Sequence, residues 1–232
     1  MKPPAPSYTM LLASLPHLPD FERTKRLPIG PERLAQRLRL LDPEDQARLH
    51  AVCELLAWRI HAHDASSAMQ RWRAAIESWL ATEGDADVRE RVCAALSRRS
   101  LLAALRRRHA GLPAPGPHEH WGHGEWMSKV ARSWNEAHFG LAFRLPWLVT
   151  ARDLLERGAA IELDRLCARL DWDDAGRLRQ RRPAGYAAVL AYRLRWKILH
   201  DRLRQNDTAA RARLQTLVQA ACPAHPLAGA CS

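Results

Sequence analysis

Apolar residues recur at intervals of three and four along almost the whole 232-residue chain. In one stretch they fall at Met69, Trp72, Ile76 and Leu80, and similar stretches follow one another to the C-terminal part of the chain. Alternation of apolar and polar residues, the mark of a half-buried strand, is almost absent. The sequence therefore predicts an all-α fold, a single-domain helical bundle of roughly seven to nine helices.

Proline and glycine residues interrupt this pattern at a few places. We expect residues 1–232 to form one helical domain, since a chain of this length suffices for one sizeable core. Residues 1–6 contain three prolines and are expected to be a loose arm. Residues 110–124, rich in Pro, Gly and His, are expected to form an exposed connecting loop, and residues 222–232 a frayed tail.

Three boundaries are predicted from local signals. The apolar stripe from Met127 to Leu141 predicts one long helix that continues to the proline at 146. The break in pattern at residues 97–100 leaves one kinked helix and two short helices as equal alternatives. Asp171, Asp173 and Asp174 form an acidic cluster, which we interpret as a turn that caps the next helix, because Asp is a preferred N-cap residue.

The helix expected from Pro183 to Gln205 is the most informative segment. Leu190, Leu194 and Ile198 lie on one apolar stripe, whereas Trp196 lies off that stripe. An exposed Trp between basic residues would suit a protein interface, but Trp196 would equally pack beneath a neighbouring helix, so both interpretations stay open. The candidate interface residues are Tyr186, Leu190, Tyr192, Leu194, Arg195, Trp196 and Lys197.

This helix also carries a resemblance. Its segment VLAYRLRWKILHDR (189–202) resembles the C-terminal signature of a bacterial family of unknown function that is encoded in V-type (A/V-type) ATPase operons. The segments YTMLLASLPHLP (8–19) and LPIGPERLAQRLRLLDPEDQARL (27–49) are similar to that family's opening, and residues 170–173 fit as well. A similar helix occurs in the all-helical stalk-to-ring connector of V-type ATPases, the component designated C, or d in eukaryotes.

The resemblance implies a non-catalytic subunit or assembly protein, similar to that connector between the central stalk and the rotor ring, which supports rotary coupling in ion transport. Its partners would be the central-stalk and membrane-ring subunits, with no cofactor, no small-molecule substrate and no catalytic residue. We expect a cytoplasmic location, peripheral to the inner face of the cell membrane through those partners. The chain is shorter than typical connector proteins of this kind, which leaves subunit and assembly factor as alternatives.

A second class of function follows from charge. The chain carries a formal net charge of +11 and an isoelectric point near 10.3, with arginine runs at 106–108 and 179–182. Such a surface suits nucleic acid, anionic lipid or an acidic protein. No DNA- or RNA-reading motif accompanies the charge, so nucleic-acid binding is an alternative and not the expected function.

A third class follows from the histidines of the central loop. His118, His120 and His123 lie within six residues, together with Glu119 and Glu125, and such side chains can bind Zn²⁺. The H-E-x-x-H spacing of metalloproteases is missing. We therefore expect a polar loop without a metal, and a metal-dependent enzyme is the alternative.

Overall fold

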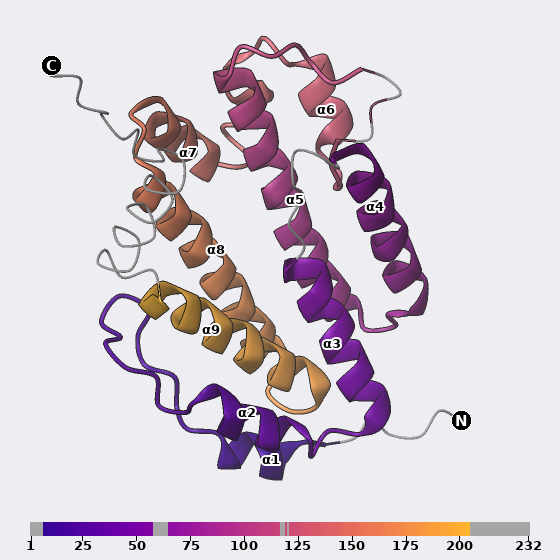
Figure 1. Cartoon of the computed structure of the whole chain (residues 1–232), viewed down its shortest axis with the longest axis vertical. Helices are drawn as coiled ribbons and strands as arrows, with labels where there is room; N and C mark the ends of the chain where they lie inside the picture. The colour runs from indigo at the N-terminus through magenta and orange to yellow at the C-terminus, as the bar shows by residue number, and fades with distance from the viewer. Residues whose placement is uncertain (1–6, 58–64, 117–118, 120, 205–232) are drawn as a thin grey trace, which may run out of the picture.

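The computed structural model describes residues 7–57, 65–116, 119 and 121–204, which form nine α-helices, one 3-10 helix and no strand (Figure 1). The prediction of an all-α fold is thereby confirmed. None of the helices in these described ranges has both the length and the apolar character needed to cross a bilayer.

Most connections between successive helices are short, but residues 15–30 and 110–126 form longer ones. Their bounds are α1 Thr9–Ser14, α2 Pro31–Leu38, α3 Pro43–Ala57, α4 Ala65–Thr82, α5 Ala86–His109, α6 Met127–Arg132, η2 Ala137–Gly140, α7 Trp147–Glu156, α8 Ala160–Arg181 and α9 Tyr186–Arg204. The helices α5 and α8 are long and run through the middle of the molecule, while α1 and α2 lie at its lower end and α6 and α7 at its upper end (Figure 1).

Buried apolar side chains form two cores that share α5 and α8. The lower core is built from α1, α2, α3, α4 and α9, with Val88, Val92 and Leu96 of α5 and Trp172 of α8. The upper core is built from α6, η2 and α7, with the C-terminal half of α5 and Leu163 of α8. The same two helices therefore hold both ends of the molecule together.

The helix α5 is one continuous helix of 24 residues, which resolves the alternatives left open at residues 97–100. Its N-terminus is capped by Asp85, whose carboxylate accepts hydrogen bonds from the backbone N–H groups of Asp87 and Val88 at 3.0 and 3.2 Å. Ser97 and Ser100 are buried within the helix. They interrupt the apolar pattern because another segment packs against them there.

That segment is the end of the loop predicted to be exposed. Residues 110–113 are indeed exposed, but residues 121–124 are half-buried against α5. The backbone N–H of His123 donates to Ser100 Oγ at 2.9 Å, and a Cβ on Gly124 would lie only 2.6 Å from Ser97 Oγ. The prediction of an exposed connection is therefore wrong for this second part, since small residues on both sides let the loop approach the helix.

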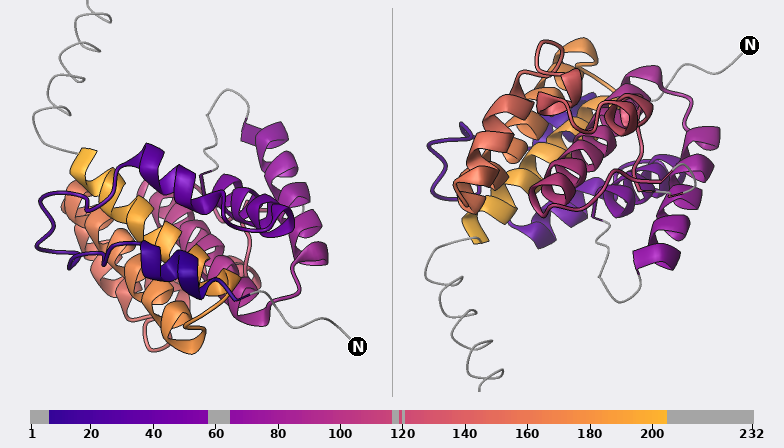
Figure 2. Two further views of the ribbon diagram at one scale, coloured as in Figure 1. Left: turned by 90° about the horizontal axis from the view of Figure 1, so that it is seen from below. Right: turned by 90° about the horizontal axis from the view of Figure 1, so that it is seen from above.

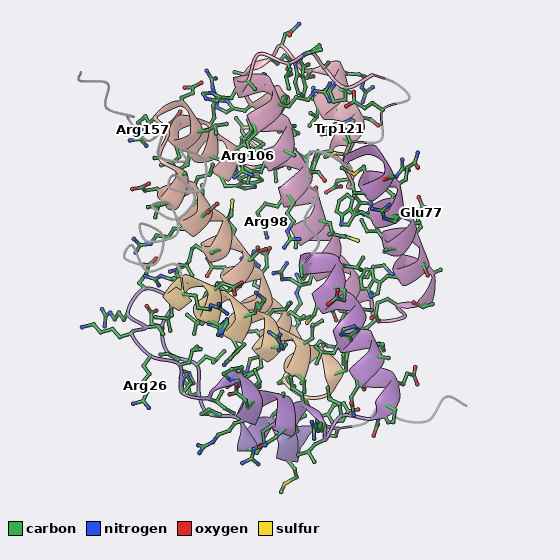
Figure 3. The ribbon with its side chains drawn as sticks, viewed as in Figure 1. Arg26, Glu77, Arg98, Arg106, Trp121 and Arg157 are labelled. Atoms are coloured by element: carbon green, nitrogen blue, oxygen red, sulfur yellow. The ribbon has the colours of Figure 1, made fainter. Side chains whose placement is uncertain are left out.

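The acidic cluster at 171–174 does not cap a helix. It lies in the middle of α8, which is continuous for 22 residues. Arg98 reaches from α5 toward α8, where it forms ion pairs with Asp171 at 3.0 Å and with Asp174 (Figure 3). Arg91, only 5% exposed, donates to the backbone carbonyl of Asp171 at 3.0 Å. The capping interpretation is wrong because the cluster lies inside a continuous helix, where Asp171 and Asp174 pair with arginines of α5 and Asp173 pairs with Arg169 of α8 itself.

The prediction of one long helix from residue 127 is also wrong. The helix α6 ends at Arg132, and the chain then turns through His138, Phe139 and Gly140, whose φ angles are 53°, 56° and 66°. Positive φ is unusual for residues other than glycine. Here it places Phe139 in the upper core, where its ring lies 5.5 Å from that of Trp134. Burial of this aromatic ring accompanies the break in the helix.

Candidate interaction surface

The helix α9 is the most buried helix at the lower end. Five of the seven candidate interface residues lie in the lower core, at 7% exposure or less: Tyr186, Leu190, Tyr192, Leu194 and Trp196. Their side chains pack inside the chain itself, so they do not form an exposed surface. For Trp196, this selects packing beneath a neighbouring segment over the exposed position.

Two polar atoms on this buried face bind the N-terminal segment. The hydroxyl of Tyr192 donates to the carbonyl of Pro16 at 2.9 Å. The indole N–H of Trp196 donates to the carbonyl of Ile29 at 3.0 Å. Both acceptors lie in the irregular stretch between α1 and α2, whose carbonyls have no helical partner. The helix α9 therefore determines the path of the chain between α1 and α2.

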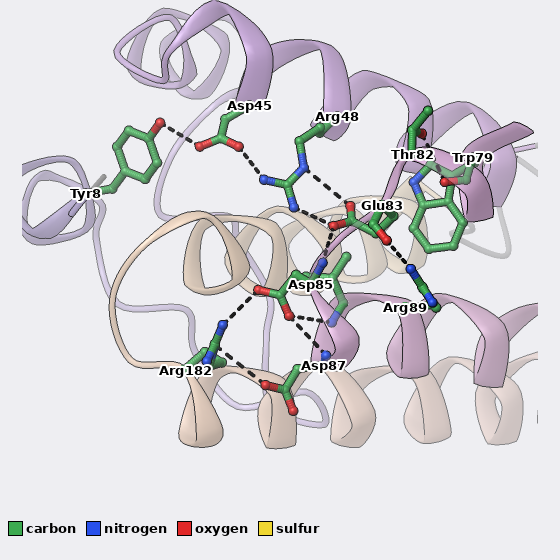
Figure 4. A network of polar contacts seen from close by, with 11 residues as sticks. Tyr8, Asp45, Arg48, Trp79, Thr82, Glu83, Asp85, Asp87, Arg89 and Arg182 are labelled. Carbon is green, nitrogen blue, oxygen red and sulfur yellow. Dashed lines mark hydrogen bonds and ion pairs between the residues drawn. The ribbon is translucent and has the colours of Figure 1, made fainter. Parts of the chain in front are cut away.

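A network of polar groups fixes α1 to α3 and to the start of α5 (Figure 4). The hydroxyl of Tyr8 donates to Asp45 at 2.7 Å, and Arg48 forms ion pairs with Asp45 at 2.6 Å and with the buried Glu83 at 2.5 Å. The guanidinium of Arg48 also lies 4.0 Å from the ring centroid of Tyr186. Burial raises the pKa of the Tyr8 phenol, so it donates a hydrogen bond throughout the physiological range.

The two remaining candidates have structural contacts of their own. The guanidinium of Arg195 stacks at 3.6 Å on the ring of Trp172, and burial lowers the pKa of this arginine. Lys197 is exposed and forms an ion pair with Asp201 at 2.5 Å, one helical turn later. The charged group of each side chain therefore contacts another residue of the same chain.

Unpaired positive charge is found instead in the stretch between α1 and α3. Six exposed basic residues occur here, and none of them forms an ion pair with any residue that the structure describes. We call this set the basic end: Arg23, Lys25, Arg26, Arg33, Arg37 and Arg39. Arg26 points away from the loop into solvent (Figure 3). Between residues 23 and 41 the only acidic residue is Glu32.

The basic end includes a groove of about 670 Å³. Arg26, Arg33 and Arg37 line it, with Gln36 and Glu32, and residues 14, 16 and 27–30 complete the wall. The groove thus includes part of the segment between α1 and α2, which accepts hydrogen bonds from Tyr192 and Trp196. Glu22, which precedes the set, is already engaged by Arg165 of α8 and by Arg202 of α9 at 3.5 Å, so it does not neutralise the groove.

Many of the other described arginines, but not all of them, form ion pairs within the chain. In the run at 106–108, Arg107 pairs with Glu119, and in the run at 179–182, Arg181 pairs with Glu90 at 2.8 Å and Arg182 with Asp85 at 3.1 Å. A second groove, at the upper end, holds Arg108 and Arg152 together with Glu136 and Glu156. The two arginine runs therefore contribute less free charge than their sequence suggests, and the basic end contributes more.

The histidine hypothesis is tested only in part. His118 and His120 lie outside the described residues. His123 is half-buried, and burial lowers its pKa, so its imidazole is neutral at pH 7. Among the residues that the structure describes, no three His, Cys, Asp or Glu side chains are close enough to hold one metal ion.

The sequence alone did not identify the basic end as a site. A signal was present, since six basic residues accompany one acidic residue between positions 23 and 41. The long runs of arginine were the more obvious feature. Whether an arginine is paired depends on carboxylates that are distant in sequence, so this distinction required the fold.

Comparison with known proteins adds no further constraint: no family model, no curated protein and no solved structure matches the chain.

Proposed function

We propose that the protein is a non-catalytic component of a V/A-type ATPase, either a subunit that resembles the stalk-to-ring connector or a factor that assists assembly. In this role it supports rotary coupling in ion transport and acts through contacts with the stalk and ring subunits. It works in the cytoplasm, at the inner face of the membrane, and needs no cofactor.

The observation that supports this proposal most is the convergence of the segments that carry the resemblance. Residues 8–19, 27–49 and 189–202 are far apart in sequence, yet they pack into one lower core. The polar contacts between them use residues of these same segments, namely Tyr192 to Pro16 and Trp196 to Ile29. Similarity in segments that pack into one core supports a family relationship more strongly than similarity in segments that do not contact one another.

The shape of the molecule also suits a mechanical role. A part that transmits force needs rigid, packed helices and large contact surfaces, and it needs no active site. The helices α5 and α8 pass through both cores and are joined by the ion pairs of Arg91 and Arg98 with Asp171 and Asp174. Load applied at one end can therefore reach the other end through two continuous helices.

The test is affinity purification of the tagged full-length protein from its native membranes, with quantitative mass spectrometry of the bound proteins. We expect stalk and ring subunits of the ATPase. Recovery in near-equal amounts identifies a subunit, and substoichiometric recovery identifies an assembly factor. Recovery of nucleic-acid-associated proteins without any ATPase component would overturn the proposal and support the alternative based on charge.

A further inference from the structure

We propose that the basic end is a membrane-binding surface that contacts an anionic lipid bilayer directly. This goes beyond the proposed function, which brings the protein to the membrane only through its partners. The surface consists of the six residues of the basic end together with two exposed apolar side chains, Met10 and Leu40. It is formed by α1, α2 and the stretch between them, which face the viewer in Figure 2, left.

The first step of the argument is charge. Anionic headgroups attract basic side chains that are free to approach the bilayer, and each such residue strengthens binding severalfold. All six side chains of the basic end are exposed and none is neutralised by a described carboxylate within ion-pair distance. Glu32 is the only acidic residue between residues 23 and 41, and Asp20, just before the set, interacts electrostatically with Arg23 without forming an ion pair. This end of the molecule therefore carries a local excess of positive charge.

The second step is the apolar side chains beside that charge. Met10 of α1 is 85% exposed, and Leu40, just after α2, is 62% exposed. Their neighbours Leu11 and Leu41 are buried, and α1 packs against α2, so Met10 lies on a helix that contacts the charged α2 and Leu40 directly follows α2. Straight and branched apolar side chains next to basic residues are typical of surfaces that enter the interfacial layer of a bilayer.

The third step distinguishes lipid from other anionic partners. Proteins that bind single-stranded nucleic acid stack bases on aromatic side chains. Tyr8 and Phe21, the Tyr and Phe residues of this end, are both buried. Contact with a phosphate backbone does not remove Met10 and Leu40 from water, whereas their transfer into the acyl layer is favourable. The combination therefore favours a lipid surface over nucleic acid.

The opposite end provides a matched control. Phe143 is 95% exposed there, and Arg132, Arg144 and Arg157 are exposed without an ion pair to a described residue. Figure 3 shows Arg157 and Arg26 at opposite ends of the molecule. However, carboxylates are interspersed at that end, as in the pair Arg152–Glu156 at 2.6 Å, so the local excess of charge is smaller.

The experiment is sedimentation of the full-length protein with vesicles of phosphatidylcholine alone or of phosphatidylcholine mixed with phosphatidylglycerol. We expect binding to the mixed vesicles only, and weaker binding as salt is raised. The variant R26Q/R33Q/R37Q should lower the partition coefficient roughly a hundredfold, on the basis of a severalfold effect per basic residue. The control R132Q/R144Q/R157Q, which removes the same charge, should change it by less than about threefold.

A second variant separates the apolar contribution from the charge. M10Q/L40Q keeps all basic residues and should still lower binding to the mixed vesicles, by about tenfold or more if both side chains enter the acyl layer. The inference is overturned if the wild-type protein binds both kinds of vesicle equally. It is also overturned if the control variant loses as much binding as R26Q/R33Q/R37Q, or if M10Q/L40Q binds as tightly as the wild-type protein. Since vesicles contain no ATPase, failure here leaves the proposed function standing, and failure of the purification leaves this inference standing.

Discussion

At the scale of single residues, Trp196 has the contact that most affects how the lower end is built. Its indole N–H satisfies the carbonyl of Ile29, and both groups are buried. We predict that Trp196→Phe lowers the free energy of unfolding by about 1–3 kcal/mol, because the carbonyl loses its partner while an aromatic ring is kept. Urea unfolding followed by circular dichroism measures the change.

Trp134→Phe is the matched control. Trp134 is also buried, at 7% exposure, but its indole N–H donates to no group among the described residues. The two variants therefore lose similar packing, and only one of them loses a hydrogen bond. Equal destabilisation by both would show that the contact to Ile29 contributes nothing beyond packing.

At the scale of elements, the loop on α5 depends on glycine at position 124. Its φ is 126°, and an added Cβ would lie 2.7 Å from the Cβ of Ser97. We predict that Gly124→Ala destabilises the protein by about 2 kcal/mol or more, because both the backbone conformation and the close approach are lost. Gly116→Ala, where nothing lies within 4 Å, should change stability by less than about 0.5 kcal/mol. Thermal unfolding of the two variants side by side decides the point.

The contact between α5 and α8 should depend on pH. Burial alone would raise the pKa of Asp174, but the hydrogen bond and charge of Arg98, together with Arg91 and Arg177, hold it below its ordinary value. A carboxyl whose pKa is lower in the folded state stabilises the protein above the unfolded pKa, near 4, and this stabilisation is lost as the pH falls through the folded pKa. We predict that wild type loses stability steeply below pH 4.

Asp174→Asn should remove about 2 kcal/mol at pH 7, a typical value for hydrogen bonds to charged groups, and should make the decline below pH 4 shallower. Asp173→Asn is the control, since Asp173 is 41% exposed and pairs with Arg169 at the surface. Surface pairs contribute about 0–1 kcal/mol. Unfolding by urea at several pH values compares the three proteins. Parallel curves for wild type and Asp174→Asn would contradict the assignment.

The helices α8 and α9 show what could and could not be predicted from the sequence. The stripe of Leu190, Leu194 and Ile198 predicted α9 correctly, because helical periodicity is a local signal. The role of Asp171 and Asp174 depended on Arg91 and Arg98, which are more than 70 residues away, so a local cap was the natural interpretation. The basic end was missed for the opposite reason. Its six residues matter because they form no ion pair with any described carboxylate, and the sequence alone does not show which arginines stay unpaired.

At the scale of the whole molecule, the two cores differ in composition yet share their longest helices. Val92 and Leu96 of α5 belong to the lower core, and Leu101 and Leu105 of the same helix belong to the upper core. Unfolding one core would therefore break helices that the other core needs. We expect the described part of the chain to unfold as one cooperative unit.

Leu148→Ala tests this expectation, because Leu148 is fully buried in the upper core, far from α9. Removal of its side chain should cost about 2–5 kcal/mol. If the molecule is one unit, native-state hydrogen exchange of α9 amides should speed up by a factor that corresponds to the whole of that loss. The converse variant, Leu190→Ala in the lower core, should affect the slowest amides of α7 in the same way. If α9 keeps its protection in Leu148→Ala, the two ends open separately. A body that opens in this way could not transmit force from one end to the other, so the same measurement bears on the mechanical role proposed above.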